Sequence, residues 1–437
     1  FMSYIVAIVG RPNVGKSTLY NRLIGERLAI IDDVSGVTRD RIYGHSVWNG
    51  KDITVIDTGG FVKNSEDVFE AAIRDQVQIA VDEADVIIFM GDVTTGITYL
   101  DDQIADMLRR STKPVVVCVN KVDNHARQLS ANEFWALGFD NTFFVSSING
   151  SGTGDLLDAV VDLLPEKEIV EDDPELPRIA VVGQPNVGKS SFVNALLGEE
   201  RNIVTDIAGT TRDSVNSRYT KFGQDFILVD TAGIRKKSKV HENLEFYSVI
   251  RAVKAIEDAD ICLLMIDAQT GVETQDMKIF SLIQKRRKGI VIMVNKWDLI
   301  ENKETNSVRD YENAIKRRIS PFNDVPILFA SALEKQRIFK AVELLMKVHK
   351  NRTQKIKTSE LNEVMQEAME KYPPPAHRGR LIKIKYVTQL PTYFPSFAFF
   401  CNHPKHVKES YRNYLENQLR ESFDLTGVPI NVHFREK

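Results

Sequence analysis

Cysteine is scarce in this chain, with three residues among 437. Cys118, Cys262 and Cys401 are odd in number and far apart in the sequence. They therefore predict neither a disulfide framework nor a zinc site. We expect a protein of a reducing compartment that is held together by its hydrophobic core.

Long apolar runs are missing as well. No stretch approaches the roughly 20 apolar residues of a transmembrane helix. The N-terminal residues enter a strand-like apolar run at once and lack the basic and then apolar pattern of a secretory signal. From these absences we expect a cytoplasmic protein with no membrane partner.

A large excess of positive or negative charge is also lacking, because the formal net charge is only −3 at pH 7. This near balance argues against nucleic-acid binding along the whole chain, and we expect no DNA partner. The charge is unevenly distributed, however, since lysine and arginine outnumber aspartate and glutamate from about residue 352 onward. A local basic module that contacts RNA remains compatible with the composition.

The most prominent feature of the sequence is an internal repeat. Four residues of the first part recur 173 positions later: Asn13, Lys16, Thr38 and Asp57 reappear as Asn186, Lys189, Thr211 and Asp230. A later pair, Asn120 and Asn295, is shifted by 175 positions. The sequence therefore predicts two copies of one domain.

Apolar runs in each copy alternate with segments of helical spacing. They predict strands at 4–9, 53–56, 86–90, 115–119 and 142–145, and again at 179–182, 226–229, 261–266, 290–294 and 327–329. This alternation is typical of the α/β class, with a mostly parallel sheet covered by helices on both faces. After the second copy, we expect a small α+β domain with the order helix, strand, strand, helix, strand.

These patterns predict four segments. We expect the first copy at residues 2–165, an acidic linker with prolines at 166–176, the second copy at 177–350 and the C-terminal domain at 351–437.

Two nearly identical stretches indicate phosphate binding. Gly10-Arg-Pro-Asn-Val-Gly-Lys-Ser17 and Gly183-Gln-Pro-Asn-Val-Gly-Lys-Ser190 both fit the phosphate-binding loop of P-loop NTPases. Each follows a predicted strand and opens a predicted helix, so backbone N–H groups and the helix dipole would face an anion. We expect Lys16 and Lys189 to contact phosphate.

Further motifs indicate a magnesium ion and switch segments. Asp57-Thr-Gly-Gly60 and Asp230-Thr-Ala-Gly233 each follow an apolar strand. A carboxylate there can approach hydrated magnesium, and Ser17 and Ser190 would supply a direct oxygen ligand. Thr38 and Thr211 lie in polar, glycine-containing loops that look like switches.

Two further motifs predict which base is bound. Asn120-Lys-Val-Asp123 and Asn295-Lys-Trp-Asp298 each follow a buried strand. A carboxylate accepts paired hydrogen bonds from N1–H and the 2-amino group of guanine, a donor pair that adenine lacks. The sequence therefore favours GTP over ATP. Ser146-Ser147 and Ser331-Ala332, after the next strands, are expected to add backbone contacts to the guanine oxygen.

One expected catalytic group is missing. Phe61 and Ile234 stand where many GTPases have a water-orienting glutamine, so hydrolysis needs other assistance. The amide oxygens of Asn13 and Asn186 could hold a potassium ion against the phosphates, unless each asparagine only shapes its loop. The segment Arg235-Lys-Lys-Ser-Lys239 has no counterpart in the first copy and is either a solvated face or a contact to phosphate backbone.

The C-terminal segment combines basic and aromatic residues. Such a set suits RNA backbone and unpaired bases, although core packing explains several of the aromatics equally well. The set comprises Lys371, Tyr372, Arg378, Arg380, Lys383, Lys385, Tyr386, Tyr393 and Phe394.

With these motifs, the chain resembles the Der, or EngA, family of bacterial tandem GTPases over essentially its whole length. The resemblance rests on the paired loops and boxes above, on Gly-[Val/Thr]-Thr-Arg-Asp at 36–40 and 209–213, and on Pro373-Pro374-Pro375. It implies a KH-like C-terminal domain and a role in maturation of the large (50S) ribosomal subunit, with rRNA and ribosomal proteins as partners. In two departures, Leu333-Glu-Lys-Gln-Arg337 lacks the expected glycine, and the tail lacks Gly-x-x-Gly.

Together the motifs predict the residues of two nucleotide sites. In the first copy the nucleotide-binding residues are Gly10, Arg11, Pro12, Asn13, Val14, Gly15, Lys16, Ser17, Thr18, Asp57, Thr58, Gly59, Gly60, Phe61, Asn120, Lys121, Val122, Asp123, Ser146 and Ser147. In the second they are Gly183, Gln184, Pro185, Asn186, Val187, Gly188, Lys189, Ser190, Ser191, Asp230, Thr231, Ala232, Gly233, Ile234, Asn295, Lys296, Trp297, Asp298, Ser331 and Ala332. The expected catalytic residues are Lys16, Thr38, Gly60, Lys189, Thr211 and Gly233. The expected magnesium ligands are Ser17, Thr38, Asp57, Ser190, Thr211 and Asp230, with potassium at Asn13 and Asn186.

The sequence thus predicts a GTP-binding and GTP-hydrolysing switch with bound GTP or GDP, Mg²⁺ and K⁺. A rival interpretation is a guanine-nucleotide-sensing module that binds RNA or protein and in which only one copy hydrolyses GTP.

Overall fold

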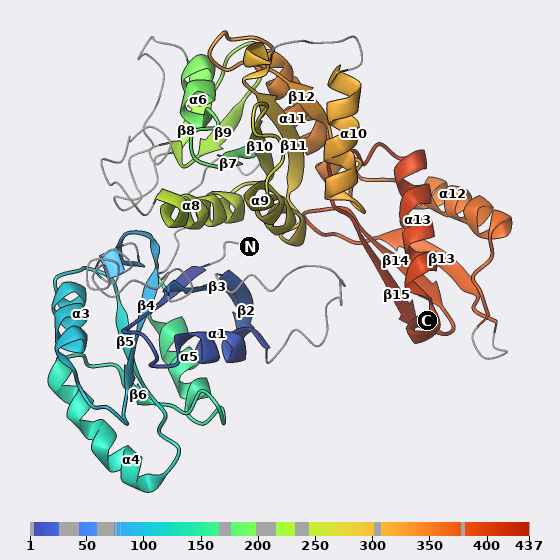
Figure 1. Cartoon of the computed structure of the whole chain (residues 1–437). Coiled ribbons are helices and arrows are strands. Elements are labelled where there is room, and N and C mark those ends of the chain that lie inside the picture. Colours follow the sequence, from blue (N-terminus) through green and yellow to red (C-terminus); the bar gives the residue numbers. More distant parts are fainter. Residues whose placement is uncertain are drawn as a thin grey trace. The chain divides into compact units, whose positions relative to one another are not determined.

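A computed structural model of the chain describes residues 4–25, 43–58, 74, 77–78, 80–165, 176–197, 216–231, 244–300, 307–376 and 381–436 (Figure 1). The chain divides into two compact units, the first built mainly from residues up to 170 and the second from the remainder. Most of the predicted acidic linker at 166–176 lies outside the described residues.

The first unit contains one sheet in the order β2-β3-β1-β4-β5-β6, parallel except for β2. Its strands are β1 (Tyr4–Val9), β2 (Tyr43–Trp48), β3 (Lys51–Asp57), β4 (Val86–Asp92), β5 (Val115–Asn120) and β6 (Thr142–Phe144). The helices are α1 (Lys16–Gly25), α3 (Tyr99–Arg109), α4 (His125–Ser130) with the 3-10 helix η4 (Ala131–Leu137), and α5 (Thr153–Asp162).

The second unit repeats this sheet, in the order β8-β9-β7-β10-β11-β12. Its strands are β7 (Arg178–Gly183), β8 (Ser217–Tyr219), β9 (Phe226–Val229), β10 (Ile261–Asp267), β11 (Gly289–Asn295) and β12 (Ile327–Phe329). Its helices are α6 (Lys189–Leu197), α8 (Leu244–Asp258), α9 (Thr274–Lys285), α10 (Ser307–Ile319) and α11 (Ile338–Thr353), with the 3-10 helix η5 (Trp297–Leu299). The predicted duplication and fold class are confirmed.

Burial on both faces explains why the central strands read as continuous apolar runs. Every residue of β1 is buried, as expected for a parallel strand between two layers of helices. Ile5 and Val9 pack into one core cluster, while Val6 and Ile8 pack into another on the opposite face. This rigid centre fixes the loops that follow β1 and β7.

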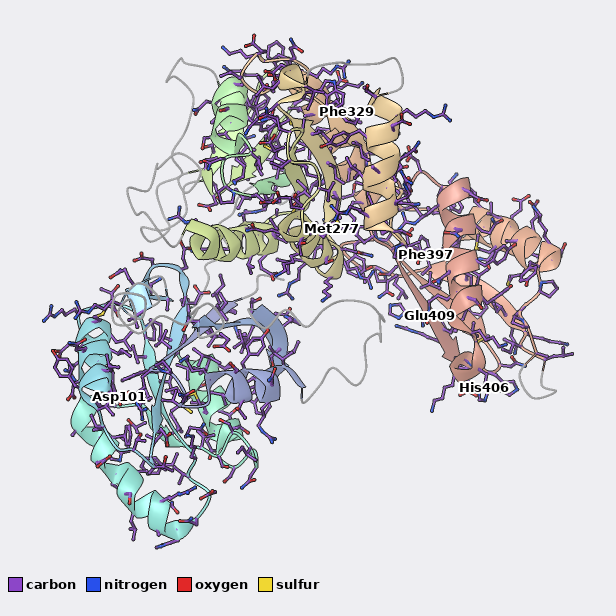
Figure 2. All side chains as sticks on the ribbon, in the orientation of Figure 1. Asp101, Met277, Phe329, Phe397, His406 and Glu409 are labelled. Atoms are coloured by element: carbon purple, nitrogen blue, oxygen red, sulfur yellow. The ribbon has the colours of Figure 1, made fainter. Side chains whose placement is uncertain are left out.

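The C-terminal domain has the predicted order of elements. They are α12 (Thr358–Lys371), β13 (Ile384–Gln389), β14 (Ser396–Cys401), η6 (Pro404–His406), α13 (Glu409–Ser422) and β15 (Asn431–Glu436). Strand β14 is antiparallel to β13 and parallel to β15, and Phe397 on β14 lies in the core of this domain (Figure 2).

Two of the aromatics proposed for RNA binding contact other rings of this domain, although Tyr372 is 60% exposed and Tyr386 is half-buried. The ring of Tyr386 stacks on Phe400 with centroids 4.5 Å apart, and Tyr372 packs against Tyr414 with centroids 5.4 Å apart. Tyr393 is largely exposed, whereas Arg378 and Arg380 lie outside the described residues.

Within the second unit, the C-terminal domain is joined to β11 and α11. The backbone of Gly427 accepts a 2.7 Å hydrogen bond from Ile290 N and donates a 2.8 Å bond to Asp324 O. Val428 is fully buried in the core of the second repeat. Among the described helices, none combines the length and apolar character that a transmembrane span requires.

Candidate nucleotide sites

Each phosphate loop closes around its lysine, which is buried in the first copy and half-buried in the second. Lys16 Nζ donates to Gly10 O at 2.7 Å and Arg11 O at 2.8 Å. Lys189 Nζ makes the same pair of bonds, to Gly183 O at 2.8 Å and Gln184 O at 2.6 Å. Burial lowers the pKa of each lysine to about 8. The two ammonium groups are thus poised at the loops where phosphate is expected.

The asparagine of each base motif clamps the phosphate loop. Asn120 Nδ2 donates to Val14 O at 2.8 Å, while its Oδ1 accepts from Ser147 N at 2.9 Å. In the second repeat Asn295 Nδ2 donates to Val187 O at 2.7 Å, and Oδ1 accepts from Ala332 N at 2.8 Å. One buried amide therefore ties the phosphate loop to the loop expected to contact guanine.

Glycine is required where this clamp passes. Gly15 and Gly188 have φ angles of 101° and 99°. A Cβ at either position would lie 2.3 Å from the Nδ2 of Asn120 or Asn295. The second glycine of the motif thus permits both the left-handed turn and the close approach of the asparagine.

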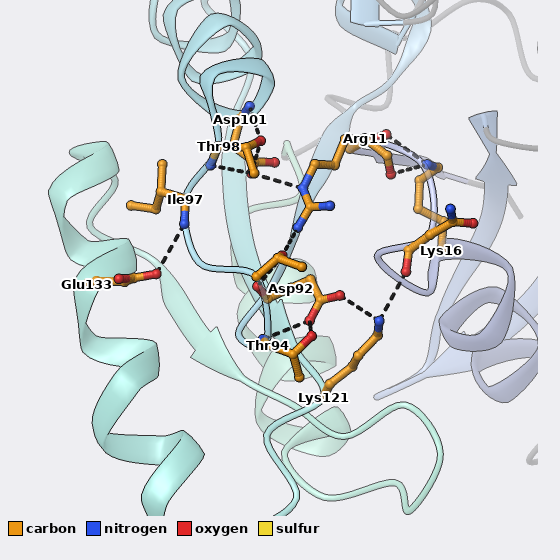
Figure 3. A network of polar contacts seen from close by, with 12 residues as sticks. Arg11, Lys16, Asp92, Thr94, Ile97, Thr98, Asp101, Lys121 and Glu133 are labelled. Atoms are coloured by element: carbon orange, nitrogen blue, oxygen red, sulfur yellow. Dashed lines mark hydrogen bonds and ion pairs between the residues drawn. The ribbon is translucent and has the colours of Figure 1, made fainter. Parts of the chain in front are cut away.

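The lysine of each base motif pairs with a carboxylate on the neighbouring strand. Lys121 Nζ lies 2.5 Å from Asp92 Oδ2 and donates to Asn13 O at 3.2 Å (Figure 3). Lys296 Nζ lies 2.5 Å from Asp267 Oδ2. Burial raises the pKa of Asp92, but hydrogen bonds from Lys121 and Thr94 outweigh it and hold this pKa below its usual value. The pair fixes the long lysine across the site.

The residue that follows the first glycine of the phosphate loop differs between the two sites. Arg11 Nε donates to Asp101 Oδ2 at 3.0 Å, and its guanidinium also donates to Thr95 Oγ1 (Figure 3). Asp101 is fully buried in the first turn of α3 and forms a capping box with Thr98.

The second repeat replaces this ion pair by a neutral contact. Gln184 hydrogen-bonds Asp276, which caps α9 in the same way. Burial raises the pKa of Asp276, although the hydrogen bonds from Glu273 N and Gln184 oppose the rise. The second site therefore has one fewer positive charge beside its phosphate loop.

The residues expected to hold magnesium are differently arranged in the two copies. Ser17 Oγ donates to Asp57 Oδ2 at 2.6 Å, so a hydroxyl and a carboxylate stand together, the hard oxygen donors that magnesium prefers. In the second copy Asp230 follows β9 with φ 54°, and its N–H donates to Asn216 Oδ1 at 3.3 Å. Thr38 and Thr211 lie outside the described residues.

The carboxylates expected to bind guanine also differ. Asp123 Oδ2 accepts from Arg127 Nη1 at 2.6 Å, in a half-exposed pair. Asp298 Oδ1 is buried and has no hydrogen-bond partner among the described residues. An unpaired buried carboxylate oxygen fits a ligand that presents N–H groups.

Comparison with known proteins decides the family. The family model described as 50S ribosome-binding GTPase matches residues 5–121 and again 178–296. The model for the KH-domain-like C-terminal part of EngA bacterial GTPase enzymes matches residues 355–435. The chain is 60% identical over 436 residues to GTPase Der of Christiangramia forsetii, covering 100% of both chains.

The chain belongs to the Der family of tandem GTPases. It is also 61% identical to GTPase Der of Flavobacterium johnsoniae over 99% of both chains, and 59% identical to that of Bacteroides fragilis over 100% of both. Like the other members, it is a GTP-binding and GTP-hydrolysing protein with two G domains and a KH-like domain.

Several predicted site residues of this Der-family chain lie outside the described residues. They are Thr38, Gly59, Gly60, Phe61, Thr211, Ala232, Gly233 and Ile234, together with the basic segment 235–239. Among the described residues, no group of three or more histidine, cysteine or acidic side chains could hold a metal ion.

The motifs missed the carboxylates that support the site. Asp92 and Asp101 recur as Asp267 and Asp276, with the same shift of 175 positions as Asn120 and Asn295. This recurrence was a usable signal. No spacing predicted Arg22, whose Nε donates to Ser147 O at 2.5 Å.

Proposed function

We propose that this chain is a GTP-dependent switch that acts in assembly of the large ribosomal subunit. Two observations support it together: each G domain joins a phosphate loop and a base motif through one buried asparagine, and both match a family described as 50S ribosome-binding GTPases. The partner would be the large subunit or its precursor, with contacts to rRNA and ribosomal proteins. The protein would act in the cytoplasm.

Our proposal assigns the phosphates of GTP to the loops 10–18 and 183–191, and the guanine base to Asp123 and Asp298. The lysines held by the carbonyls of the two loops and the unpaired oxygen of Asp298 support this assignment. The domain limits 2–165, 177–350 and 351–437 remain part of the proposal, as do Thr38, Gly60, Thr211 and Gly233 as catalytic residues.

Mg²⁺ is the divalent ion that this site would use. Ser17 and Asp57, with Ser190, Asp230 and the two switch threonines, would hold it, and it would neutralise charge on the phosphates. The chain's own residues orient the nucleotide through the lysine and the loop N–H groups.

K⁺ is proposed at Asn13 and Asn186, because neither copy has a glutamine after Asp-x-x-Gly. Turnover measured in potassium and in sodium buffers of equal ionic strength tests this assignment. Faster turnover in potassium supports it, and equal turnover contradicts it.

A second candidate function is supported by the different conformations of Asp57 and Asp230. In that alternative only one G domain hydrolyses GTP, and the other senses guanine nucleotide. Lys16→Ala and Lys189→Ala, each assayed for GTP turnover, separate the two: activity lost in part in both variants indicates two active sites, whereas one silent substitution indicates a sensor.

Co-sedimentation with purified large ribosomal subunits tests the main proposal. We expect the affinity for the subunit to differ by tenfold or more, roughly 1.4 kcal/mol, between the chain with a non-hydrolysable GTP analogue and the chain with GDP, as for a nucleotide switch. Binding that does not depend on the nucleotide, or no binding to the subunit, would contradict it.

A further inference from the structure

The loop after the last strand differs between the two G domains. The bridges Ser146↔Ser151 and Ser331↔Gln336 show that the loops superpose with a shift of 185 positions. In the first, Gly150 and Gly152 have φ angles of 86° and 76°. The second keeps the same turn with Lys335 at 55° and Arg337 at 61°.

This substitution has an energetic cost, because a residue with a Cβ is less stable than glycine in left-handed backbone. The glycine that the sequence led us to expect here is replaced by two long cations without a change of turn. Strained positions of this kind cluster at binding and switch sites. Arg337 has a use within the fold, because its Nη1 donates to Phe329 O at 3.1 Å. The strain at Lys335 points to a use for its side chain outside the loop.

An exposed aromatic pair lies beside this loop. The rings of Phe222, in the turn between β8 and β9, and Phe339, in the first turn of α11, meet edge to face with centroids 4.5 Å apart. Phe222 is 74% exposed and Phe339 is 50% exposed. Phe222 itself has a φ of 55°.

The described part of the first G domain has no such pair at the matching positions. Asn49 and Gly154 occupy the matching positions, and the hairpin is instead anchored by Trp48 Nε1, which donates to Asp158 Oδ1 at 2.6 Å. The exposed rings are thus a property of the second G domain rather than of the repeated fold.

The surface around this aromatic pair also differs in charge from the matching surface of the first G domain. Around the pair are four cations, Lys221, Lys335, Arg337 and Lys340, and two carboxylates, Glu334 and Glu343, with Glu343 2.8 Å from Lys340. At the matching positions, the first G domain has no cation and two carboxylates, Asp155 and Asp158.

We propose that this surface, formed by Lys221, Phe222, Lys335, Arg337, Phe339 and Lys340, docks single-stranded RNA. Exposed aromatic rings stack on unpaired bases, and cations beside them bind the phosphate backbone. An excess of cations here, in a chain whose net charge is −3, favours RNA over a protein partner. The inference deepens the proposed function, on which it rests in taking that RNA to be ribosomal.

Fluorescence anisotropy of the full chain with a labelled 12-nucleotide uridine RNA tests the aromatic pair. We expect Phe222→Ala with Phe339→Ala to weaken binding about tenfold or more, the usual effect of losing stacked bases. Lys340→Glu should weaken binding and flatten its salt dependence. Tyr99→Ala removes a 70% exposed aromatic from the first G domain and should change nothing. Affinities unchanged in the double variant would overturn the proposal.

Lys335→Gly distinguishes a role of the cation in RNA binding from a role of the loop in stability alone. Relief of the left-handed lysine should raise the Tm of the second G domain by about 2–4 °C, while loss of the cation weakens RNA binding. A raised Tm with unchanged RNA affinity would mean that the loop is only a turn, and would overturn the proposal.

Co-sedimentation of the same variants with large ribosomal subunits separates this inference from the proposed function. If the unaltered chain fails to bind subunits, the proposed function fails, while the oligonucleotide titration still judges the surface. If the variants lose subunit binding but keep RNA affinity, the surface contacts a ribosomal protein, and the RNA proposal is wrong.

Discussion

Lys16 and Lys189 set the behaviour of the two sites toward pH. Burial lowers the pKa of each from 10.5 to about 8, so the charged form carries a cost in the folded protein that disappears as the pH rises from 8 toward 10.5. A bound phosphate favours the charged ammonium and raises its pKa again. Nucleotide affinity should therefore be flat below pH 8 and fall above it, by up to about tenfold per pH unit.

Proton uptake measures this directly. At pH 8.5 a lysine of pKa about 8 is roughly three-quarters deprotonated, so calorimetric titration with GDP in two buffers of different ionisation enthalpy should show about three-quarters of a proton taken up per site. Lys16→Ala should abolish the proton uptake at the first site and leave that at the second site unchanged. Binding heats that do not depend on the buffer would contradict the assigned role of the lysines.

The exchange of Arg11 for Gln184 predicts a reciprocal effect on stability. Arg11→Gln leaves the fully buried Asp101 facing a neutral amide and should destabilise the first G domain by about 1–3 kcal/mol. Gln184→Arg gives Asp276 a cationic partner and should raise the Tm of the second. Thermal scanning of both variants tests this pairing, and a shift of the same sign in both would contradict it.

The residues proposed to contact the phosphates and the base come from motifs that are contiguous in the sequence, and these contacts stay predictions. The motifs did not predict the supporting residues. Asp92 and Asp101 have a signal in their recurrence 175 positions later, but the partners that they contact come from distant segments that only the parallel sheet brings together. Arg22 has no such signal. Asn120 was predicted as a base contact, and the structure adds its bonds to Val14 and Ser147.

At the scale of elements, the apolar runs predicted the buried strands well, including β1, β9 and β12 at their observed limits. They missed β2 and β8, which lie at sheet edges. An edge strand is half solvated and alternates polar with apolar residues, so Tyr43–Trp48 does not form a continuous apolar run. The second helix expected in the C-terminal domain is α13, and the short 3-10 helix η6 precedes it.

A substitution in the loop between β1 and α1 tests how this loop is held. Gly15→Ala would place a Cβ 2.3 Å from Asn120 Nδ2 in left-handed backbone, and should break the clamp between the phosphate loop and Ser147. We expect at least a hundredfold loss of nucleotide affinity at the first site only, equivalent to roughly 2.7 kcal/mol. Gly50→Ala is the matched control, because its φ is 76° but its Cβ would meet nothing within 4 Å.

At the scale of the molecule, the second G domain and the KH-like domain share a core. A Cβ on Gly427 would lie 2.6 Å from Val348 Cγ2 and 2.8 Å from Ile290 O. Gly427→Ala should therefore separate the two domains locally and expose the Ile290 amide, which donates to Gly427 O.

Hydrogen exchange tests this junction. The Ile290 amide should exchange at least ten times faster in Gly427→Ala, a change of roughly 1.4 kcal/mol in local opening. The β5 amides of the first G domain should be unaffected and serve as the internal control. Unchanged exchange at Ile290 would show that the shared core does not stabilise this edge.

The proposed switch depends on two guanine sites, each with its own carboxylate. Calorimetric titration of the full chain with GDP counts them most directly. We predict two sites in the unaltered protein, one in Asp123→Ala and one in Asp298→Ala, with no comparable binding of ADP. Two full-affinity sites in either variant, or ADP bound as tightly as GDP, would contradict the central claim.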